Sequence, residues 1–402
     1  MSVAIIVDTF PRWSERFIAR ELNELQRRGL DFTIYCLRAG DSDCDSDPDF
    51  SGLMHRRVVL PSCFLPSFAR ELGLDAAAKA RMKLVENELG VTAFRQIGCA
   101  DSLAKLIREH RHTSVYAHFA SLPSTLGWLA AEALKLPFVM SCHARDVFVD
   151  GQLLREKTDC ARRVFTCNKK ALNELQRLRD GGDVVADKFV LMPHGLPLES
   201  YPFSSHGERT SNTKSLRLLA SGRFVPKKGF RDLIDAMAVS ELSDAAITLT
   251  ILGDGVERKS MTKQIARLGL SSRISMPGIV ADQAMRNYYD DADAFVMPSV
   301  ETPDGDSDGL PNALLEAAAF GIPIIGTNAG SLSDLLNDES GIIIDRTIDA
   351  ARVSRDIALA IRDVMINPDK AAARALRMRQ FVEERYDNRR NIEPLFNELS
   401  IP

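Results

Sequence analysis

Cationic residues and glycines gather in one short segment of the second half of the chain. Gly222, Arg223, Lys228 and Gly229 lie between an apolar run that predicts a strand and an amphipathic run that predicts a helix. A guanidinium and an ammonium group beside a helix start suit a phosphate group, because both can make charge-assisted hydrogen bonds to it. The segment therefore predicts a phosphate-binding turn, although a solvated basic turn fits this short pattern about as well.

A second segment places carboxylates around the start of a helix. We expect this helix to begin near Pro311, because proline is well tolerated in the first turn. Its free backbone N–H groups and the positive end of its dipole then favour an anion. Asp308 lies in the loop before the helix, and Glu316 lies inside it.

The same loop also resembles part of a calcium site. Asp304, Asp306 and Asp308, followed by Gly309, match the first half of a calcium-binding loop. That pattern needs a glutamate where the chain has Leu315, and a carboxylate one residue later points about 100° away on a helix. Calcium binding is therefore disfavoured.

Other strand-to-helix turns narrow the choice of chemistry. The glycines of Gly253–Gly255 let a ligand approach the backbone, although a tight turn alone also explains them. The first turn, Asp8–Arg12, contains no glycine, so the dinucleotide fingerprint is absent. The chain also has no G-x-x-x-x-G-K-[ST] run and no G-x-S-x-G elbow. These absences argue against a nicotinamide dehydrogenase, a P-loop hydrolase and an esterase.

The elements that must position these turns follow an α/β pattern. Short apolar runs alternate with longer amphipathic segments, which indicates parallel sheets. In the first half the predicted strands are Val3–Val7, Phe32–Leu37, Val115–His118, Phe138–His143, Val164–Cys167 and Phe189–Met192. In the second half they are Leu216–Ala220, Thr248–Leu252, Ile274–Met276, Ala294–Met297, Pro323–Gly326 and Ile342–Ile344. Between the first two strands, Trp13–Arg28 predicts a helix that Gly29 ends.

The segment Ser204–Ser215 has no apolar residue, and we interpret it as a linker. The predicted domains are 1–204 and 205–375, with C-terminal helices in 376–402 that can pack back on the first domain. The expected fold class is α/β, with two Rossmann-like doubly wound domains facing a deep cleft.

Composition excludes several further classes. The 402 residues are 45% hydrophobic and 26% charged, which is ordinary for globular proteins. A net charge of −4 gives no global basic field for nucleic acid. The seven cysteines include no C-x-x-C pair, which disfavours structural zinc and a disulfide framework. With no secretory signal and no apolar run near the ~18 residues of a membrane span, we expect a soluble, cytoplasmic protein. The five aspartates of Asp41–Asp49 predict a solvated acidic loop.

Several motifs in order resemble one enzyme family over almost the whole chain. The segment Asp308–Ala317, followed by Gly321-Ile322-Pro323, resembles the E-x₇-E signature of the family-4 retaining glycosyltransferases, which have the GT-B fold. Gly222–Gly229 is similar to the family's donor-diphosphate motif, and Gly253–Gly255 and Pro277-Gly278 fall where the family has similar turns. Asp308 replaces the first glutamate of the signature, so the carboxylate is one methylene shorter.

The first half resembles one branch of that family. Phe10–Ile18 is similar to the F/Y-P-x-x-S-E-T-F-I opening of the colanic-acid-type exopolysaccharide branch. Ala117–Ala120 and Ser141–Asp146 look like two further stretches of the branch.

The resemblance implies a function in polysaccharide biosynthesis. It implies a retaining, metal-independent transfer of a hexosyl unit from a nucleotide-diphosphate sugar to a glycan, lipid-linked or small aglycone acceptor, with no cofactor. Two alternatives stay open: a catalytically silent GT-B protein that binds a sugar nucleotide or a partner, and an epimerase or phosphorylase on the same fold.

The resemblance also implies roles for individual residues, and no metal ligands. The implied catalytic residues are His143, Asp308, Arg223 and Lys228. The implied donor-binding residues are Gly222, Arg223, Lys228, Gly253, Val280, Asp308, Gly309, Leu310, Pro311, Asn312 and Glu316. The implied acceptor-side residues are Arg12, Glu15 and His118. A buried structural imidazole is the alternative for His143. For His118 the same alternative fits about as well as the acceptor-side role. We interpret His194 as structural.

A lipid-linked acceptor would bring the protein to a membrane surface. Two segments mix cationic and apolar residues, Ser67–Arg81 and Phe94–Arg111, and predict a peripheral, salt-sensitive contact with anionic lipid. Ordinary amphipathic helices with solvated charges explain both segments at least as well.

Overall fold

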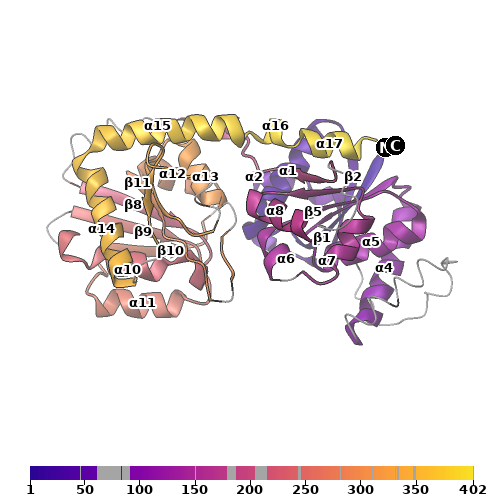
Figure 1. The fold of residues 1–402 in the computed structure, drawn as a ribbon, viewed down its shortest axis with the longest axis horizontal. Helices are drawn as coiled ribbons and strands as arrows, with labels where there is room; N and C mark the ends of the chain where they lie inside the picture. The colour runs from indigo at the N-terminus through magenta and orange to yellow at the C-terminus, as the bar shows by residue number, and fades with distance from the viewer. Residues whose placement is uncertain are drawn as a thin grey trace. The chain divides into compact units, whose positions relative to one another are not determined.

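The computed structural model divides into two compact units, which are described separately. The first unit comprises residues 1–195 together with 388–402, and the second comprises 196–387 (Figure 1). The structure describes residues 1–45, 47–60, 83, 91–149, 151–178, 187–203, 215–242, 246–280, 282–303, 305–308, 311–330, 332, 335–346 and 350–401.

The first unit is built on a parallel sheet, which has seven strands within the described ranges, in the order β3-β2-β1-β4-β5-β6-β7. The strands are β1 (Ser2–Phe10), β2 (Asp31–Ala39), β3 (Arg57–Val59), β4 (Ser114–His118), β5 (Phe138–Cys142), β6 (Arg163–Thr166) and β7 (Phe189–Leu191). The helices are α1 (Arg16–Arg27), α2 (Pro48–Ser51), α4 (Val91–Glu109), α5 (Leu122–Leu134), α6 (Ala144–Phe148), α7 (Leu154–Cys160), α8 (Lys169–Arg177), α16 (Asn388–Asn391) and α17 (Glu393–Leu399).

Helices cover both faces of this sheet. Along β1, Ala4 and Ile6 are buried in a cluster that contains residues of α4 and α5. The alternate residues Val3 and Ile5 are buried in a second cluster with residues of α1 and α17. Because side chains alternate across a strand, an unbroken apolar run is what a strand covered on both faces requires.

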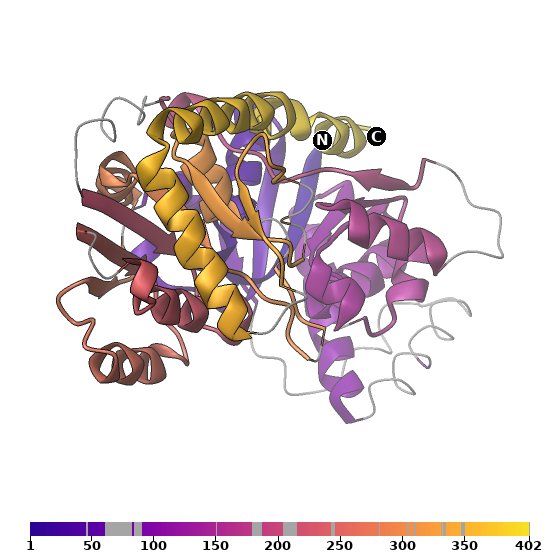
Figure 2. The same ribbon diagram turned by 60° about the vertical axis from the view of Figure 1, so that its left-hand side comes forward.

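The second unit repeats this architecture. Its parallel sheet has six strands among the described residues, in the order β10-β9-β8-β11-β12-β13. The strands are β8 (Ser215–Ser221), β9 (Ala246–Leu252), β10 (Ile274–Gly278), β11 (Ala294–Met297), β12 (Ile324–Thr327) and β13 (Ile342–Ile344). The helices are α10 (Phe230–Met237), α11 (Arg258–Arg267), α12 (Asp282–Asp291), α13 (Asn312–Ala319), α14 (Ala350–Ile366) and α15 (Pro368–Arg385). Figure 2 shows α14 crossing one face of the sheet, where it packs on β12 and β13.

The sequence predicts the helix–strand order well. Each of the twelve predicted strands overlaps an observed one, and β11 and β13 have the predicted bounds. Of the predicted helix Trp13–Arg28, the first residues form a 3₁₀ turn before α1, and Gly29 follows the helix with a φ of +82°. The short edge strand β3 was not predicted, because it contains only three residues, begins with an arginine and has no buried side chain.

The units divide at different positions from the predicted boundaries of 204/205 and 375/376. Leu196 belongs to the second unit, because its N–H donates to Tyr386 O at 2.7 Å and its side chain is buried in that unit's core. The α15 residues Met378 and Val382 are buried in the same core. The chain returns to the first unit at Asn388, whose side-chain amide donates to Arg20 O at 3.0 Å.

The last helices complete the first unit. Ile392, Leu395 and Leu399 are buried beside residues of α1 and β1, and Figure 1 shows α17 lying along this unit. Within the described ranges, no helix is both long enough and apolar enough to cross a membrane.

The interpretation of Asp41–Asp49 as a solvated loop is wrong for two of its carboxylates. Asp47 is buried, and its Oδ2 accepts a hydrogen bond from Arg16 Nη2 at 3.0 Å. Asp49 Oδ2 accepts one from Arg20 Nε at 3.1 Å. The acidic loop therefore folds onto the cationic residues that α1 presents along one face, which composition alone does not reveal.

Candidate functional site

Two loops of the second unit leave the carboxyl ends of neighbouring strands. β8 ends at Ser221 and β11 ends at Met297, and these strands pair in the middle of the sheet. The strand order reverses there, because β9 lies on one side of β8 and β12 lies on the far side of β11. Doubly wound sheets bind ligands at such a switch point. The 222–229 turn and the 298–311 loop therefore occupy the edge where a ligand is expected.

A buried ion pair joins this turn to this loop. Nζ of Lys228 lies 2.9 Å from Oδ2 of Asp308, and Ser299 Oγ donates to the same oxygen at 2.6 Å. Lys228 is 9% exposed and Asp308 is 7% exposed. Buried charges of this kind need a partner, because they have lost most of their hydration. The structure thus brings together two residues that the resemblance assigns to the donor.

The other two cations of the turn differ from each other. Lys227 Nζ lies 2.9 Å from Asp306 Oδ1, and Lys227 O accepts a hydrogen bond from Val300 N at 2.8 Å. The Arg223 side chain is exposed and makes no hydrogen bond or ion pair with any described residue. Arg223 is therefore the cation of this turn whose charge is not already paired within the described ranges.

Glycines allow the backbones to meet. Gly229 has a φ of +64°, and a Cβ there would lie 1.9 Å from Pro298 O. Gly253 has a φ of +130°, and a Cβ there would lie 1.9 Å from Gly222 O. No other residue type fits such positions without a backbone shift. Packing alone explains Gly253, and its contact with a donor stays a prediction.

Helix α13 begins where the sequence predicts. Pro311 is the N-cap, its carbonyl accepts a hydrogen bond from Leu314 N at 3.0 Å, and Asn312 is the first helical residue. Glu316 is half-buried, and its Oε2 accepts a hydrogen bond from Tyr289 OH at 2.9 Å. Tyr289 lies on α12 and was not predicted, because its segment shows only a helical pattern. Its hydroxyl holds the Glu316 carboxylate in one orientation.

Some predicted donor contacts cannot be placed in this way. Gly309 and Leu310 lie outside the described residues, and so does Asp304 of the calcium-loop alternative. Val280 is half-buried and packs against the core cluster that includes α13. Its neighbour Ile279 is 62% exposed.

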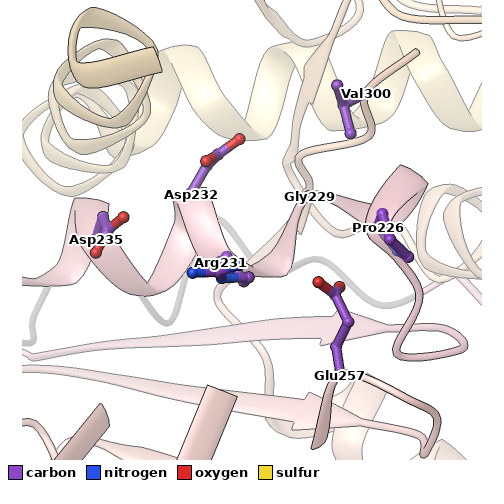
Figure 3. A pocket seen from close by; sticks show the side chains of 7 residues that line it. All are labelled: Pro226, Gly229, Arg231, Asp232, Asp235, Glu257 and Val300. Atoms are coloured by element: carbon purple, nitrogen blue, oxygen red, sulfur yellow. The ribbon is translucent and has the colours of Figure 1, made fainter. Parts of the chain in front are cut away.

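A hollow of about 280 Å³ adjoins the 222–229 turn (Figure 3). Its lining residues are Pro226, Gly229, Arg231, Asp232, Asp235, Glu257 and Val300. Burial raises the pKa of Glu257. With three carboxylates and one guanidinium, the lining is unfavourable for a diphosphate. Arg223 and Lys228 are not among these lining residues, so we do not assign the donor to this hollow.

In the first unit the strand order reverses between β1 and β4. Arg12 and Glu15 follow β1, and Arg12 Nη1 donates to Glu15 Oε1 at 2.9 Å. Burial raises the pKa of Glu15, and the positive charge of Arg12 offsets part of this effect. The structure therefore pairs these two predicted acceptor-side residues with each other.

His118 is fully buried at the end of β4. Its Nε2 lies 2.7 Å from Glu21 Oε1, and Tyr116 OH donates to the same oxygen at 2.9 Å. Ser141 Oγ lies 2.7 Å from Tyr116 OH. These contacts fit the structural alternative for His118, and its acceptor role stays a prediction. Glu21 was missed, because on α1 it reads as one more polar helix residue.

His143 follows β5 and lies among aromatic rings. Its ring centroid is 5.2 Å from that of Phe17, 4.6 Å from that of Phe119 and 5.1 Å from that of His194. Its backbone N–H donates to Asp146 Oδ2 at 2.8 Å, which orders the start of α6. The His143 side chain is 12% exposed, so it is neither fully buried nor free in solvent.

His194 and Cys167 complete the surroundings of His143. Burial and the neighbouring His143 and His118 lower the pKa of His194 well below its ordinary value. Burial raises the pKa of Cys167 to about 11. Both side chains are therefore neutral at neutral pH. Sequence reasoning did not connect these residues, because they come from separate strand ends.

The proposed membrane-facing segments are only partly described. Ser67–Arg81 lies outside the described residues. Phe94–Arg111 overlaps α4, whose Leu103, Ala104 and Ile107 are buried in the first unit's core. These apolar residues are therefore not available to a lipid surface.

One protein family matches most of the second unit. Residues 204–378 match the family "Glycosyl transferases group 1". A segment of 173 residues is 30% identical to Escherichia coli WcaL, named as a colanic acid biosynthesis glycosyltransferase, and covers 43% of this chain and 42% of that protein. The matched segment thus spans less than half of this relative. Bacillus subtilis TuaC, named as a teichuronic acid biosynthesis glycosyltransferase, is 23% identical over 339 residues, 82% of this chain and 80% of that protein.

Solved structures match both units together. Anabaena HepE, in complex with UDP and glucose, has a TM-score of 0.71 at 17% identity, covering 100% of this chain and 99% of that chain. Sucrose-phosphate synthase of Thermosynechococcus elongatus has a TM-score of 0.70 at 18% identity, covering 99% of each chain. At such identities the likeness establishes the fold. Residues 204–378 are therefore similar to group 1 glycosyl transferases, within a chain that has the two-domain GT-B fold.

Proposed function

We propose that this protein transfers a hexosyl unit from a nucleoside diphosphate sugar to an acceptor hydroxyl, with retention of anomeric configuration, as a family-4 enzyme. The observation that carries this proposal is the Lys228–Asp308 contact of 2.9 Å at the switch point between β8 and β11. It joins the predicted phosphate-binding turn to the loop that enters α13. Lys228, Asp308 and the N-terminus of α13 would then contact one ligand.

The chemistry follows from where negative charge develops. The bond between the anomeric carbon and the diphosphate oxygen breaks, and the acceptor oxygen bonds to that carbon and passes its proton to the departing diphosphate. The leaving diphosphate gains charge as this happens. Arg223, Lys228 and the N–H groups at the start of α13 stabilise that charge, which is the largest single contribution in many such transfers.

Two cationic side chains, together with the N–H groups of a helix start, can replace a divalent ion at the diphosphate, so we propose that transfer needs no metal. Asp308 is proposed to contact the sugar, and Glu316 the ribose hydroxyls. Tyr289 supports the second role, because its hydroxyl orients the Glu316 carboxylate. We propose that further donor contacts are made by backbone atoms of Gly222, Gly253, Val280, Pro311 and Asn312.

The first-unit roles rest on the resemblance. His143 is proposed to contact the donor sugar, and Arg12, Glu15 and His118 to act on the acceptor side. The pairing of Arg12 with Glu15 at the end of β1 supports a shared role for those two. For His118, a positioning role through Glu21 is equally compatible with its burial.

Donor and acceptor are proposed from relatives. WcaL and TuaC are named for colanic acid and teichuronic acid biosynthesis, which supports a growing glycan or its lipid-linked form as acceptor. The HepE complex contains UDP, so uridine diphosphate sugars are the first donors to test. Such a role would place the protein in the cytoplasm, with peripheral membrane contact where the acceptor is lipid-linked.

The test is a donor screen with product analysis. Purified protein is incubated with UDP- and GDP-hexoses, with and without glycan, lipid-linked and small aglycone acceptors, in buffer containing EDTA. We expect release of nucleoside diphosphate, a new glycoside whose anomeric signal matches that of the donor, and no loss of rate in EDTA. Binding without turnover would favour a silent GT-B protein, and an altered free sugar or sugar phosphate would favour an epimerase or phosphorylase.

A further inference from the structure

Three metal-binding side chains of the first unit meet beside the carboxyl ends of adjacent strands. His143 follows β5, Cys167 follows β6, and His194 lies shortly after β7. These strands are neighbours in the sheet. Parallel strands present their carboxyl ends at one edge, so residues far apart in sequence are gathered there.

The geometry of the three side chains suits a shared ion. One ligand atom from each of His143, Cys167 and His194 lies within 4.8 Å of the other two. Ligands of a tetrahedral zinc ion lie about 2.0–2.3 Å from the metal, so they are roughly 3.5 Å apart. Small side-chain rotations would therefore complete the site without moving the strands.

A second observation comes from unmet hydrogen-bonding capacity. Nδ1 of His143 and Nε2 of His194 are buried and have no hydrogen-bond partner among the described residues. Buried polar atoms are nearly always paired, so an unpaired one calls for an explanation. The Cys167 sulfur has only a weak contact, accepting from Asn168 Nδ2 at 3.6 Å. A metal ion would bind the lone pairs of these two nitrogens and of the Cys167 sulfur.

We propose that His143, Cys167 and His194 bind one Zn²⁺ ion. Two imidazoles and one thiolate are typical zinc ligands, whereas calcium and magnesium require oxygen ligands. Binding breaks the S–H bond of Cys167, and its proton passes to solvent with no change of oxidation state. Three protein ligands leave a fourth position for water. Asp146 Oδ2 lies 3.6 Å from the same His143 Nδ1, which is too far for a hydrogen bond.

This inference goes beyond the proposed transfer reaction, which needs no metal. An ion held by His143 would compete with any contact between that residue and a donor sugar. Zinc is therefore expected to inhibit transfer, and a chelator to restore it. The binding test below needs no knowledge of donor or acceptor, so its result is independent of the proposed function.

The experiment measures zinc binding to the full chain after chelator treatment and dialysis. A chromophoric zinc indicator serves as competitor, and elemental analysis gives the stoichiometry. We expect one tightly bound zinc per chain, and a sulfur-to-cobalt charge-transfer band when Co²⁺ replaces it. Cys167→Ser, which is close in size, should abolish that band and weaken zinc binding by about tenfold or more. His194→Asn should weaken zinc binding to a similar extent.

Two control variants separate this site from adventitious binding. His55 is exposed and Cys160 is half-buried, and neither belongs to the cluster. His55→Asn and Cys160→Ser should keep the wild-type affinity and the cobalt band. Thermal melts confirm that every variant compared is folded. Cys167→Ala replaces Cys167→Ser if the serine variant is not folded. Unchanged zinc affinity in folded Cys167 and His194 variants, or equal loss in the controls, would overturn the proposal.

Discussion

The ammonium group of Lys228 lies 2.9 Å from the carboxylate of Asp308, although the two residues are proposed to serve different parts of one ligand. While they are paired, each charge largely neutralises the other. A donor diphosphate that binds Lys228 must then compete with Asp308 for the same ammonium group. Breaking the ion pair costs free energy, which lowers the affinity for the donor.

The first prediction concerns this competition. Asp308→Asn keeps the size of the side chain and removes its charge, so Lys228 becomes free for phosphate. We expect affinity for UDP or GDP to rise, by on the order of tenfold for one charge-assisted contact, while transfer slows because the sugar contact is altered. Calorimetry measures the affinity. Asp306→Asn, which alters the Lys227 pair, is the matched control and should change it less. A loss of nucleotide affinity in Asp308→Asn would refute the competition.

The second prediction separates the two cations. Arg223 is exposed, and its charge has no partner among the residues that the structure describes, so Arg223→Ala should remain stable and lose about 10²–10³-fold in turnover. Lys228→Ala would leave Asp308 buried and unpaired, which costs about 3–5 kcal/mol. The double variant Lys228→Ala/Asp308→Asn avoids that penalty and should show a comparable loss of turnover relative to Asp308→Asn alone. Arg267→Ala, exposed on α11, controls for general charge effects. Near-normal turnover in both test variants would end the diphosphate assignment.

The third prediction assigns Glu316 to the ribose. Glu316→Ala should weaken binding of a nucleoside diphosphate but leave inorganic pyrophosphate binding unchanged, because pyrophosphate has no ribose. Tyr289→Phe removes one donor to Glu316 and should have a smaller effect in the same direction, of about 1 kcal/mol. Calorimetry with both ligands decides the matter. Equal weakening for pyrophosphate would mean that Glu316 supports the loop rather than the ribose.

The fourth prediction uses two glycines with similar backbone angles. Gly229 has a φ of +64° and Gly269 a φ of +70°. A Cβ at Gly229 would collide with Pro298 O, whereas a Cβ at Gly269 has nothing within 4 Å. Gly269→Ala should cost only the left-handed strain, about 1–2 kcal/mol. Gly229→Ala should cost clearly more in urea unfolding and should also weaken nucleotide binding. Equal costs would show that the close approach is not needed.

The fifth prediction is a pH dependence of stability. Burial, together with His110, lowers the pKa of His112 to about 4, whereas an unfolded histidine titrates near 6.5. The unfolded chain therefore takes up a proton that the folded chain resists. Stability from this site is complete above about pH 6.5 and falls as the pH drops towards 4, by up to roughly 3 kcal/mol. Urea unfolding of wild type and His112→Gln at pH 7 and pH 4.5 measures the difference. Parallel losses in both proteins would contradict this origin.

The fold could be predicted from sequence because its signals are local. Apolar runs buried on both faces mark the strands, and Pro311 and Gly29 mark a helix start and a helix end. The same local signals placed Lys228 and Asp308 at strand exits. They could not show that the two side chains pair, because contact between loops after β8 and β11 depends on strand order in the sheet.

Errors arose where long-range packing decides the outcome. The 204–215 segment lacks apolar residues and was interpreted as the domain boundary, but Leu196 already packs in the second unit. Asp47 is a polar residue in an acidic run, yet Arg16 on α1 gives it a buried partner.

The return of the chain to its first unit affects the order of events during synthesis. The second unit is one continuous stretch, 196–387, and is complete before residues 388–399 are translated. The first unit must wait, because Ile392, Leu395 and Leu399 fill part of its core. Domains generally fold as units while the chain grows. On the ribosome, the later-made domain can therefore finish folding first, and the earlier one closes only when α17 emerges to cover it.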